Sequence, residues 1–231
     1  MSKLLHKANT LLWSLVWRTK KFSDVDSLVD AHFARWSEIG HQNRSGLQIA
    51  LQNIDKRNAS IVETGTSAYG TDSSRLFDSF VRSFGGKFFS VDINKYPSNR
   101  LKFAKSRNTK FFVMDSVDFL SNLEQLTAVG KVNLFYLDSW DVDWANPLAS
   151  AEHGRKEMKA IKHHLSQGTI LVIDDTPASI EWIPEEGKAA ANRFKEEFGV
   201  LPGKGAFFRE VLSGLEFSIL HHDYNLVLKF N

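Results

Sequence analysis

The sequence predicts an α/β fold in which a mostly parallel sheet is covered by helices on both faces. Short apolar runs alternate with amphipathic helical segments, most of these runs end directly on an acidic residue, and two last runs are joined by only a few residues. Continuous apolar runs are typical of strands buried on both faces, whereas a short connection requires an antiparallel pair. We therefore expect a doubly wound, mostly parallel seven-stranded sheet that closes with a C-terminal antiparallel hairpin.

The composition fits one such domain with a modest addition. The chain has 231 residues, a formal net charge of +2 and no cysteine. This length supports a full hydrophobic core, and the nearly neutral charge gives no reason to expect a nucleic-acid partner. The absence of cysteine excludes disulfides and thiolate metal sites, and it is compatible with the reducing cytoplasm where we expect the protein to act. Any bound metal would need oxygen or imidazole ligands.

Residues 1–45 are predicted to form an N-terminal helical extension of a domain at residues 46–231. Residues 11–17 of this extension are rich in leucine and tryptophan, and basic residues lie on both sides. The stretch is too short to span a bilayer, which takes about 20 residues, and no small-residue cleavage site follows it. Two alternatives remain. It packs on the domain or on a second copy in a homo-oligomer, or it makes weak peripheral contact with a membrane.

The remaining elements follow in a regular order. Apolar positions at helical spacing predict two helices before the first strand, at residues 28–36 and 47–54. Strands are expected at residues 61–62, 88–91, 111–114, 134–137 and 170–173, with the hairpin at residues 215–220 and 226–230. Helices are expected at residues 76–84, 117–126, 150–165 and 186–198. The first of these ends at two glycines, and the third is followed by another, which are common helix stops.

Each of the five parallel strands leads into one or two carboxylates. These residues are Glu63, Asp92, Asp115, Asp138 and the pair Asp174 and Asp175. In a parallel sheet the carboxyl ends of the strands share one edge, and such folds bind ligands beyond that edge. A structural protein has little use for so many desolvated acids in one place, so the pattern predicts a functional site there.

The turn after the first strand predicts a nucleotide-like cofactor site. Gly65 lies in this turn, and a second glycine and two serines come before the next helix. Glycine lets the backbone approach a ligand, and the start of a helix offers free N–H groups to an anion. Asp92 ends the second strand, where its carboxylate can accept two ribose hydroxyls. The strict GxGxxG pattern of NAD sites is absent, which disfavours that cofactor.

Five parallel strands followed by an antiparallel hairpin resemble the Rossmann-like fold of class I S-adenosylmethionine-dependent methyltransferases, over about residues 45–231. The resemblance implies S-adenosylmethionine as cofactor, with Gly65 against its methionine part, Glu63 organising the loop and Asp115 and Ser116 near the adenine. From residue type alone, Asp115 or Ser116 could equally cap the next helix. The expected cofactor-binding residues are Glu63, Gly65, Thr66, Ser67, Asp92, Asp115 and Ser116.

Three further carboxylates predict a metal site beside the cofactor. Asp138, Asp174 and Asp175 end strands four and five, which we expect to be neighbours. Unpaired, they would repel one another, whereas a hard divalent cation, Mg²⁺ above all, would relieve the repulsion. The alternative is that Asp174 and Asp175 form a solvated turn. The arrangement resembles metal-dependent O-methyltransferases of the catechol type, and more closely the macrocin/novobiocin sugar-modifying group.

This resemblance implies a metal-assisted O-methyltransferase for a hydroxyl of a sugar, a glycoconjugate or a similar small molecule. A metal-bound hydroxyl has a lowered pKa, and a nearby base removes its proton. Asp141 is the first candidate for this base, and Asp143 and His153 are the next, unless His153 merely lies on a helix face. The tryptophans of residues 140–144 and Trp182 either stack on a sugar or pack against the domain. A metal-independent methyltransferase and a non-catalytic binding module remain as alternatives.

Overall fold

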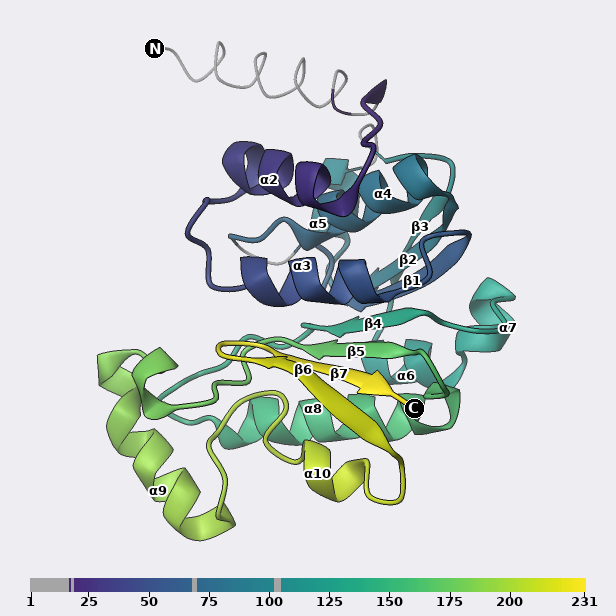
Figure 1. Cartoon of the computed structure of the whole chain (residues 1–231). Helices are drawn as coiled ribbons and strands as arrows, with labels where there is room; N and C mark the ends of the chain where they lie inside the picture. The colour runs from purple at the N-terminus through teal and green to yellow at the C-terminus, as the bar shows by residue number, and fades with distance from the viewer. Residues whose placement is uncertain (1–16, 18, 68–69, 102–104) are drawn as a thin grey trace.

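The computed structural model describes residue 17 and residues 19–67, 70–101 and 105–231 (Figure 1). Its seven-stranded sheet has the order β3-β2-β1-β4-β5-β7-β6. The strands are β1 (Ala59–Thr64), β2 (Gly86–Asp92), β3 (Thr109–Val113), β4 (Leu134–Leu137), β5 (Ile170–Ile173), β6 (Phe217–His222) and β7 (Leu226–Phe230). Strands β1 to β5 are parallel, and β7 is antiparallel to both β5 and β6. The predicted doubly wound sheet with a C-terminal hairpin is confirmed.

Helices cover both faces of the sheet, as Figure 1 shows. One layer holds α2 (Val25–Trp36), α3 (Arg44–Asn53) and α4 (Ser73–Phe84), and the opposite layer holds α6 (Ser116–Ser121), α7 (Leu123–Thr127), α8 (Leu148–Ile161) and α10 (Phe208–Val211). Helix α5 (Lys95–Leu101) connects β2 to β3, and α9 (Lys188–Phe198) follows β5. Short 3-10 turns lie at Lys162–His164, Ile180–Trp182 and Glu185–Gly187.

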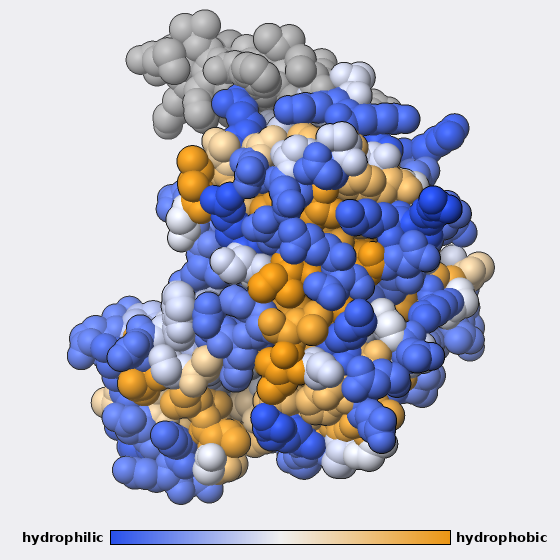
Figure 2. All heavy atoms as spheres, viewed as in Figure 1, coloured by the Kyte–Doolittle hydropathy of each residue, from blue (hydrophilic) through white to orange (hydrophobic). Residues whose placement is uncertain are grey.

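Alternation within the strands divides the interior into two cores. Ile61 and Phe88 pack with α2, α3 and α4, whereas their neighbours Val62 and Phe89 pack with the helices of the other layer. Burial on both faces explains why the strands read as continuous apolar runs. In the space-filling view, polar side chains cover most of the visible face, and apolar residues gather across its middle, where the sheet lies (Figure 2).

The structure differs from the sequence prediction at several elements. The helix expected at residues 117–126 is broken into α6 and α7, because Asn122 leaves the helical region at φ −116° and ψ 22°. Helix α5 was not predicted, since its sequence KYPSNRL is polar and has no apolar period. The hairpin strand expected at residues 215–220 lies two residues later, because Leu215 still belongs to the turn after α10, its N–H donating to Leu212 O.

The described part of the N-terminal extension packs on the sheet. Leu28 of α2 is fully buried in the same core as β1, and this core also holds Leu47 of α3, which follows the predicted boundary at residue 45. Trp17 is 7% exposed and its indole N–H donates to Ser79 Oγ at 2.8 Å, so this residue packs on the domain. Residues 11–16 lie outside the described residues. Within the described ranges, no helix combines the length and the apolar character that a membrane span requires.

Candidate active site

The register of the sheet brings the acidic strand ends together. Leu137 of β4 pairs with Ile173 of β5, so Asp138 and Asp174 leave the sheet side by side. The backbone N–H of Asp138 donates to Thr64 O and that of Asp174 donates to Leu137 O, each at 3.1 Å. Strands four and five are thus neighbours, as predicted, and their terminal carboxylates lie at one edge of the sheet.

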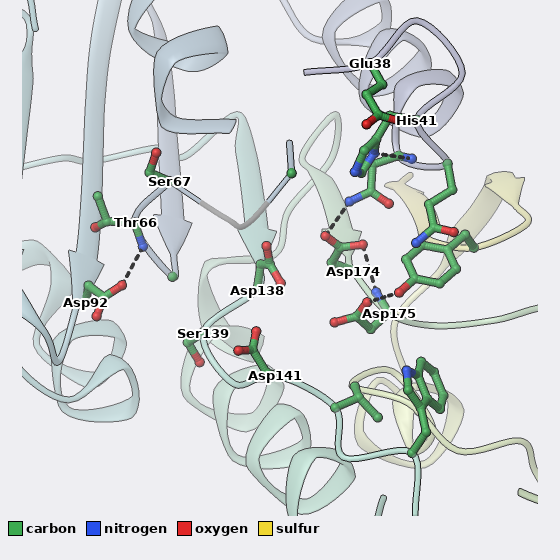
Figure 3. A pocket seen from close by; sticks show the side chains of 17 residues that line it. Glu38, His41, Thr66, Ser67, Asp92, Asp138, Ser139, Asp141, Asp174 and Asp175 are labelled. Carbon is green, nitrogen blue, oxygen red and sulfur yellow. Dashed lines mark hydrogen bonds between the residues drawn. The ribbon is translucent and has the colours of Figure 1, made fainter. Parts of the chain in front are cut away.

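A cavity of about 740 Å³ opens at this edge (Figure 3). Its lining combines the turn after β1, the ends of β2, β4 and β5, and the loop between α2 and α3. The lining residues are Glu38, His41, Gln42, Asn43, Gly65, Thr66, Ser67, Gly70, Asp92, Asp138, Ser139, Asp141, Val142, Trp144, Asp174, Asp175 and Tyr224. Among the site residues predicted from the sequence, those outside this lining are Glu63, Asp115, Ser116 and His153.

The turn after β1 depends on a glycine. Gly65 has φ +80°, and a Cβ atom on it would lie 2.0 Å from the carbonyl oxygen of Asp138. Only glycine therefore lets the exit of β1 lie against the exit of β4. The next N–H, from Thr66, donates to Asp92 Oδ2 at 3.1 Å, and Asn94 N donates to Asp92 Oδ1 at 2.7 Å. Each oxygen of Asp92 keeps a lone pair for a ligand, and burial raises the pKa of this carboxyl.

Glu63 stabilises the turn after β1 through hydrogen bonds. Its fully buried carboxylate accepts hydrogen bonds from the hydroxyls of Ser73 at 2.6 Å, Ser90 at 2.5 Å and Ser74. Burial raises the pKa of Glu63 to about 7. The carboxylate thus ties β1 to β2 and to the start of α4, an arrangement that suits an organising role in the loop.

Three predicted site residues, Asp115, Ser116 and His153, lie outside the cavity lining. Asp115 caps α6, accepting the N–H groups of Val117 at 2.8 Å and of Asp118 at 3.1 Å, which was the alternative reading of this residue. His153 Nε2 lies 3.0 Å from Ser116 Oγ.

The same imidazole continues a polar chain toward the cavity. His153 Nε2 lies 2.8 Å from Ser139 Oγ, and that hydroxyl is 2.8 Å from Glu157 Oε1. Ser139 lines the cavity, whereas His153 and Glu157 are outside its lining. His153 is thus connected to the cavity through Ser139.

A buried lysine lies among the three predicted metal ligands. Lys204 is 2% exposed, and its ammonium donates to Asp138 Oδ1 and, at 2.8 Å, to Asp175 Oδ2. The Tyr224 hydroxyl donates to the other oxygen of Asp175. Burial alone would lower the pKa of Lys204, but the charges of Asp138 and Asp175 outweigh it and raise that pKa. The sequence analysis did not predict Lys204; its one signal is a lysine between two glycines, in a Pro-Gly-Lys-Gly turn.

Protein donors also reach the third carboxylate. Asp174 Oδ2 accepts from Asn43 Nδ2 at 2.6 Å and from the Tyr136 hydroxyl at 2.5 Å, and Asp174 Oδ1 accepts from Asp175 N at 2.8 Å. The Tyr136 oxygen also lies 3.2 Å from Asp138 Oδ2, but its single hydrogen serves the shorter contact. Within the described residues, Asp138 Oδ2 is therefore the carboxylate oxygen of this cluster left without a donor. Burial raises the pKa of Asp174 to about 6.

The cluster does not fit a divalent cation as it is arranged. Mg²⁺ or Ca²⁺ needs several oxygens within about 2.0–2.6 Å and no competing cation between them. Here an ammonium lies between Asp138 and Asp175, and Asn43 and Tyr136 both donate to Oδ2 of Asp174. Over residues 19–67, 70–101 and 105–231, no group of three or more acidic, histidine or cysteine side chains is arranged to hold a metal. The predicted ligands are brought together, and a lysine forms ion pairs with two of the three.

The loop after β4 divides its side chains between the cavity and the wall. Asp141 is exposed and lines the cavity (Figure 3). Trp144 also belongs to the lining. Trp140 is 50% exposed and its ring lies 5.1 Å from that of His153, outside the cavity lining. Asp141 and Trp144 therefore belong to the cavity, whereas Trp140 lies beside His153.

His41 is a cavity residue that the sequence analysis missed. Its Nδ1 accepts the Asn43 N–H at 3.2 Å, and burial lowers the pKa of the imidazole. The neutral ring consequently carries its hydrogen on Nε2 and acts as a donor there. A second cavity of about 520 Å³ adjoins this loop, lined by Glu38, Gly40, His41, Gln42, Ser45, Trp182 and Asp223. No motif marks this loop, because it lies in the extension ahead of the predicted domain.

Comparisons with known proteins support the fold. No protein-family model matches the sequence. No curated protein sequence matches it either. Among solved structures, the MycE methyltransferase of the mycinamycin biosynthetic pathway, in complex with Mg, SAH and mycinamycin VI, superposes with a TM-score of 0.55 at 16% identity. That match covers 92% of this chain and 56% of MycE, so the chain spans a little more than half of that protein.

Two further structures share the architecture. The SAH-bound methyltransferase PaMTH1 of Podospora anserina has a TM-score of 0.55 at 11% identity, and the match covers 100% of this chain and 98% of PaMTH1. An O-methyltransferase family protein from Burkholderia thailandensis has a TM-score of 0.50 at 12% identity, covering 90% of this chain and 59% of that one. The chain therefore has the Rossmann-like methyltransferase fold.

Proposed function

We propose that this protein is an S-adenosylmethionine-dependent methyltransferase that methylates a hydroxyl group of a small polar acceptor, of the sugar or glycoconjugate class. The observation that carries the proposal is that one cavity joins the Gly65 turn and Asp92 to the carboxylates at the ends of β4 and β5. S-adenosylmethionine, when bound, supplies an electrophilic methyl group. An enzyme that uses it must hold an acceptor oxygen in line with that methyl and remove its proton.

The Gly65 side of the cavity fits the cofactor. The close backbone approach at Gly65 leaves no room for a side chain, and Asp92 offers two carboxylate oxygens to ribose hydroxyls. Ile93 follows directly and is 78% exposed, which gives an adenine ring an apolar surface. The cavity volume of about 740 Å³ lies within the range of about 300–1,000 Å³ typical of small-molecule sites. MycE and PaMTH1, which share the fold, are SAH complexes.

The β4 and β5 side fits a hydroxyl acceptor. A neutral alcohol is a weak nucleophile, so a carboxylate near its oxygen must accept its proton. Asp141, which lines the cavity and is exposed, remains our candidate for this base. Asp138 Oδ2, which has no donor among the described residues, is a second oxygen able to orient the hydroxyl. We assign His153 a positioning role, because it reaches the cavity through Ser139.

The walls favour a polar acceptor with apolar faces. The adjoining cavity shares Glu38, His41 and Gln42 with the main one, and it adds the half-exposed ring of Trp182. Sugars present hydroxyls at their edges and C–H groups on their faces. Carboxylates and amides suit the first and a tryptophan ring suits the second.

The proposed methyltransferase has a metal-assisted form and a metal-independent form. The sequence resemblance implies Mg²⁺, whereas the ion pairs of Lys204 with Asp138 and Asp175 favour the metal-independent form. Turnover in excess chelator separates them: an unchanged rate supports the metal-independent form, and a complete loss of activity supports metal assistance.

Isothermal titration calorimetry tests the proposed function itself. We expect one S-adenosylhomocysteine per chain to bind and NAD⁺ not to bind. Asp92→Ala should weaken the binding, while the exposed control Asp223→Ala, outside the main cavity, should leave it unchanged. Failure of S-adenosylhomocysteine to bind, or tight binding of NAD⁺, would contradict the proposal. Binding without methyl transfer to any hydroxyl acceptor would favour the non-catalytic alternative.

A further inference from the structure

Lys204 is held in place by its own turn. Its backbone N–H donates to Asp175 O at 3.1 Å, and Gly205 N donates to Thr176 Oγ1 at 2.9 Å. A Cβ atom at Gly203 would lie 2.2 Å from Asp175 O, and one at Gly154 of α8 would lie 2.0 Å from Lys204 O. The turn is therefore packed against the end of β5 and against α8 at two points where no side chain fits, and its lysine extends to the carboxylates.

The ammonium lies below the floor of the cavity. Asp138, Asp174 and Asp175 line the cavity, whereas Lys204 does not and is 2% exposed. Among the described residues, Lys204 is the basic side chain that forms ion pairs with this cluster, and its partners are Asp138 and Asp175. A buried lysine and buried carboxylates each lose hydration, so each is stable only with the other in place.

We propose that Lys204 is the resident cation of this site, taking the place of a divalent metal between Asp138 and Asp175. In this arrangement the ammonium faces the protein and the carboxylates face the cavity. Lys204 is then a positioning residue: it fixes two carboxylates that can hold an acceptor hydroxyl, without itself touching the acceptor. That catalytic consequence rests on the proposed methyl transfer, whereas the identity of the cation does not.

Mn²⁺ binding tests the proposal without any turnover measurement. Wild-type protein, stripped with chelator and dialysed, is titrated with Mn²⁺ and the free ion is followed by electron paramagnetic resonance. We expect no site tighter than about 1 mM in the wild type, because the ammonium already lies between Asp138 and Asp175 and would repel a cation there. Lys204→Met keeps the length of the side chain and removes its charge, so it should gain one Mn²⁺ site per chain.

Two variants complete the comparison. Lys204→Arg keeps the positive charge and should stay free of Mn²⁺. Lys188→Met removes an exposed lysine that pairs with Glu185 at 2.6 Å, and it should behave as the wild type. If Lys204→Met does not fold in metal-free buffer, refolding it with and without about 1 mM Mn²⁺ decides, since a ligand of the native state stabilises that state. Recovery of the fold with Mn²⁺ supports the proposal.

Three results would overturn it. One is a wild-type Mn²⁺ site that Asp174→Asn removes. Another is a folded Lys204→Met protein that binds no Mn²⁺, and the third is a Lys204→Met chain that Mn²⁺ does not rescue. S-adenosylhomocysteine titration of the same wild-type sample reports on the cofactor separately, so failure of the methyltransferase proposal and failure of the lysine proposal give different results.

Discussion

Gly65→Ala should damage both the stability of the protein and its cofactor site. The residue has φ +80°, and an added Cβ would lie 2.0 Å from Asp138 O, which is backbone and cannot rotate away. An alanine in the left-handed region costs about 1 kcal/mol, and overpacking adds about 1–3 kcal/mol. We expect the free energy of unfolding to fall by about 2–4 kcal/mol.

Gly214→Ala is the matched control for this change. Gly214 has φ +83°, but a Cβ atom there would meet nothing within 4 Å. This variant therefore carries the backbone cost without the clash, and it should lose only about 1 kcal/mol. Urea unfolding gives both free energies, and calorimetry with S-adenosylhomocysteine should show weaker binding for Gly65→Ala alone. Equal losses of stability in the two variants would refute the close approach of β1 to β4.

Three further changes probe separate parts of the site. Glu63 has a pKa of about 7 in the folded protein, against 4.5 for an exposed glutamate. Between these two pH values the native state therefore binds more protons than the unfolded state. The free energy of unfolding should consequently fall by about 3 kcal/mol as the pH rises through this range. Glu63→Gln should remove this loss from urea-unfolding free energies measured at pH 5 and 8, and equal losses in both proteins would contradict it. Asp141→Asn should lower the single-turnover rate by about 10²- to 10⁴-fold and leave the affinity for S-adenosylhomocysteine unchanged. The control Asp143→Asn should leave that rate unchanged. Equal rates for the wild type and Asp141→Asn at every pH would remove Asp141 from the mechanism. Trp182→Ala should raise the acceptor KM by about 3- to 10-fold, whereas Trp140→Ala should not, and steady-state kinetics that give both the same KM would exclude Trp182 as an acceptor contact.

The sheet could be predicted because its signals are local. Runs such as residues 134–137 and 170–173 are buried on both faces, and that burial leaves an uninterrupted apolar pattern in the sequence. The carboxylate that follows each run then marks the ligand-binding edge. The two helix predictions that were wrong also have local causes. Helix α5 has no apolar period, and Asn122 breaks a helix that hydrophobic spacing alone would continue.

The wall of the cavity could not be predicted in the same way. Asn43 donates to Asp174 across 131 residues of sequence, and His41 reaches the cavity from the same loop. Both positions precede the predicted domain boundary at residue 45. Helices α2 and α3 nevertheless share a core with β1, so the extension supplies residues to the candidate site. Only the packing of these helices on the sheet could bring that loop to the carboxyl ends of the strands.

The nature of the cation is the hardest part to predict, for a general reason. Three converging aspartates require neutralisation, and the sequence shows this requirement through Asp138, Asp174 and Asp175 alone. The requirement is met equally by a metal, by bound protons or by a basic side chain. Lys204 lies 66 residues from Asp138, in a stretch where the strand and helix pattern has loosened, so nothing in the sequence ties the two together. An acidic cluster at a sheet edge therefore predicts a positive partner, and only the tertiary structure can say which one.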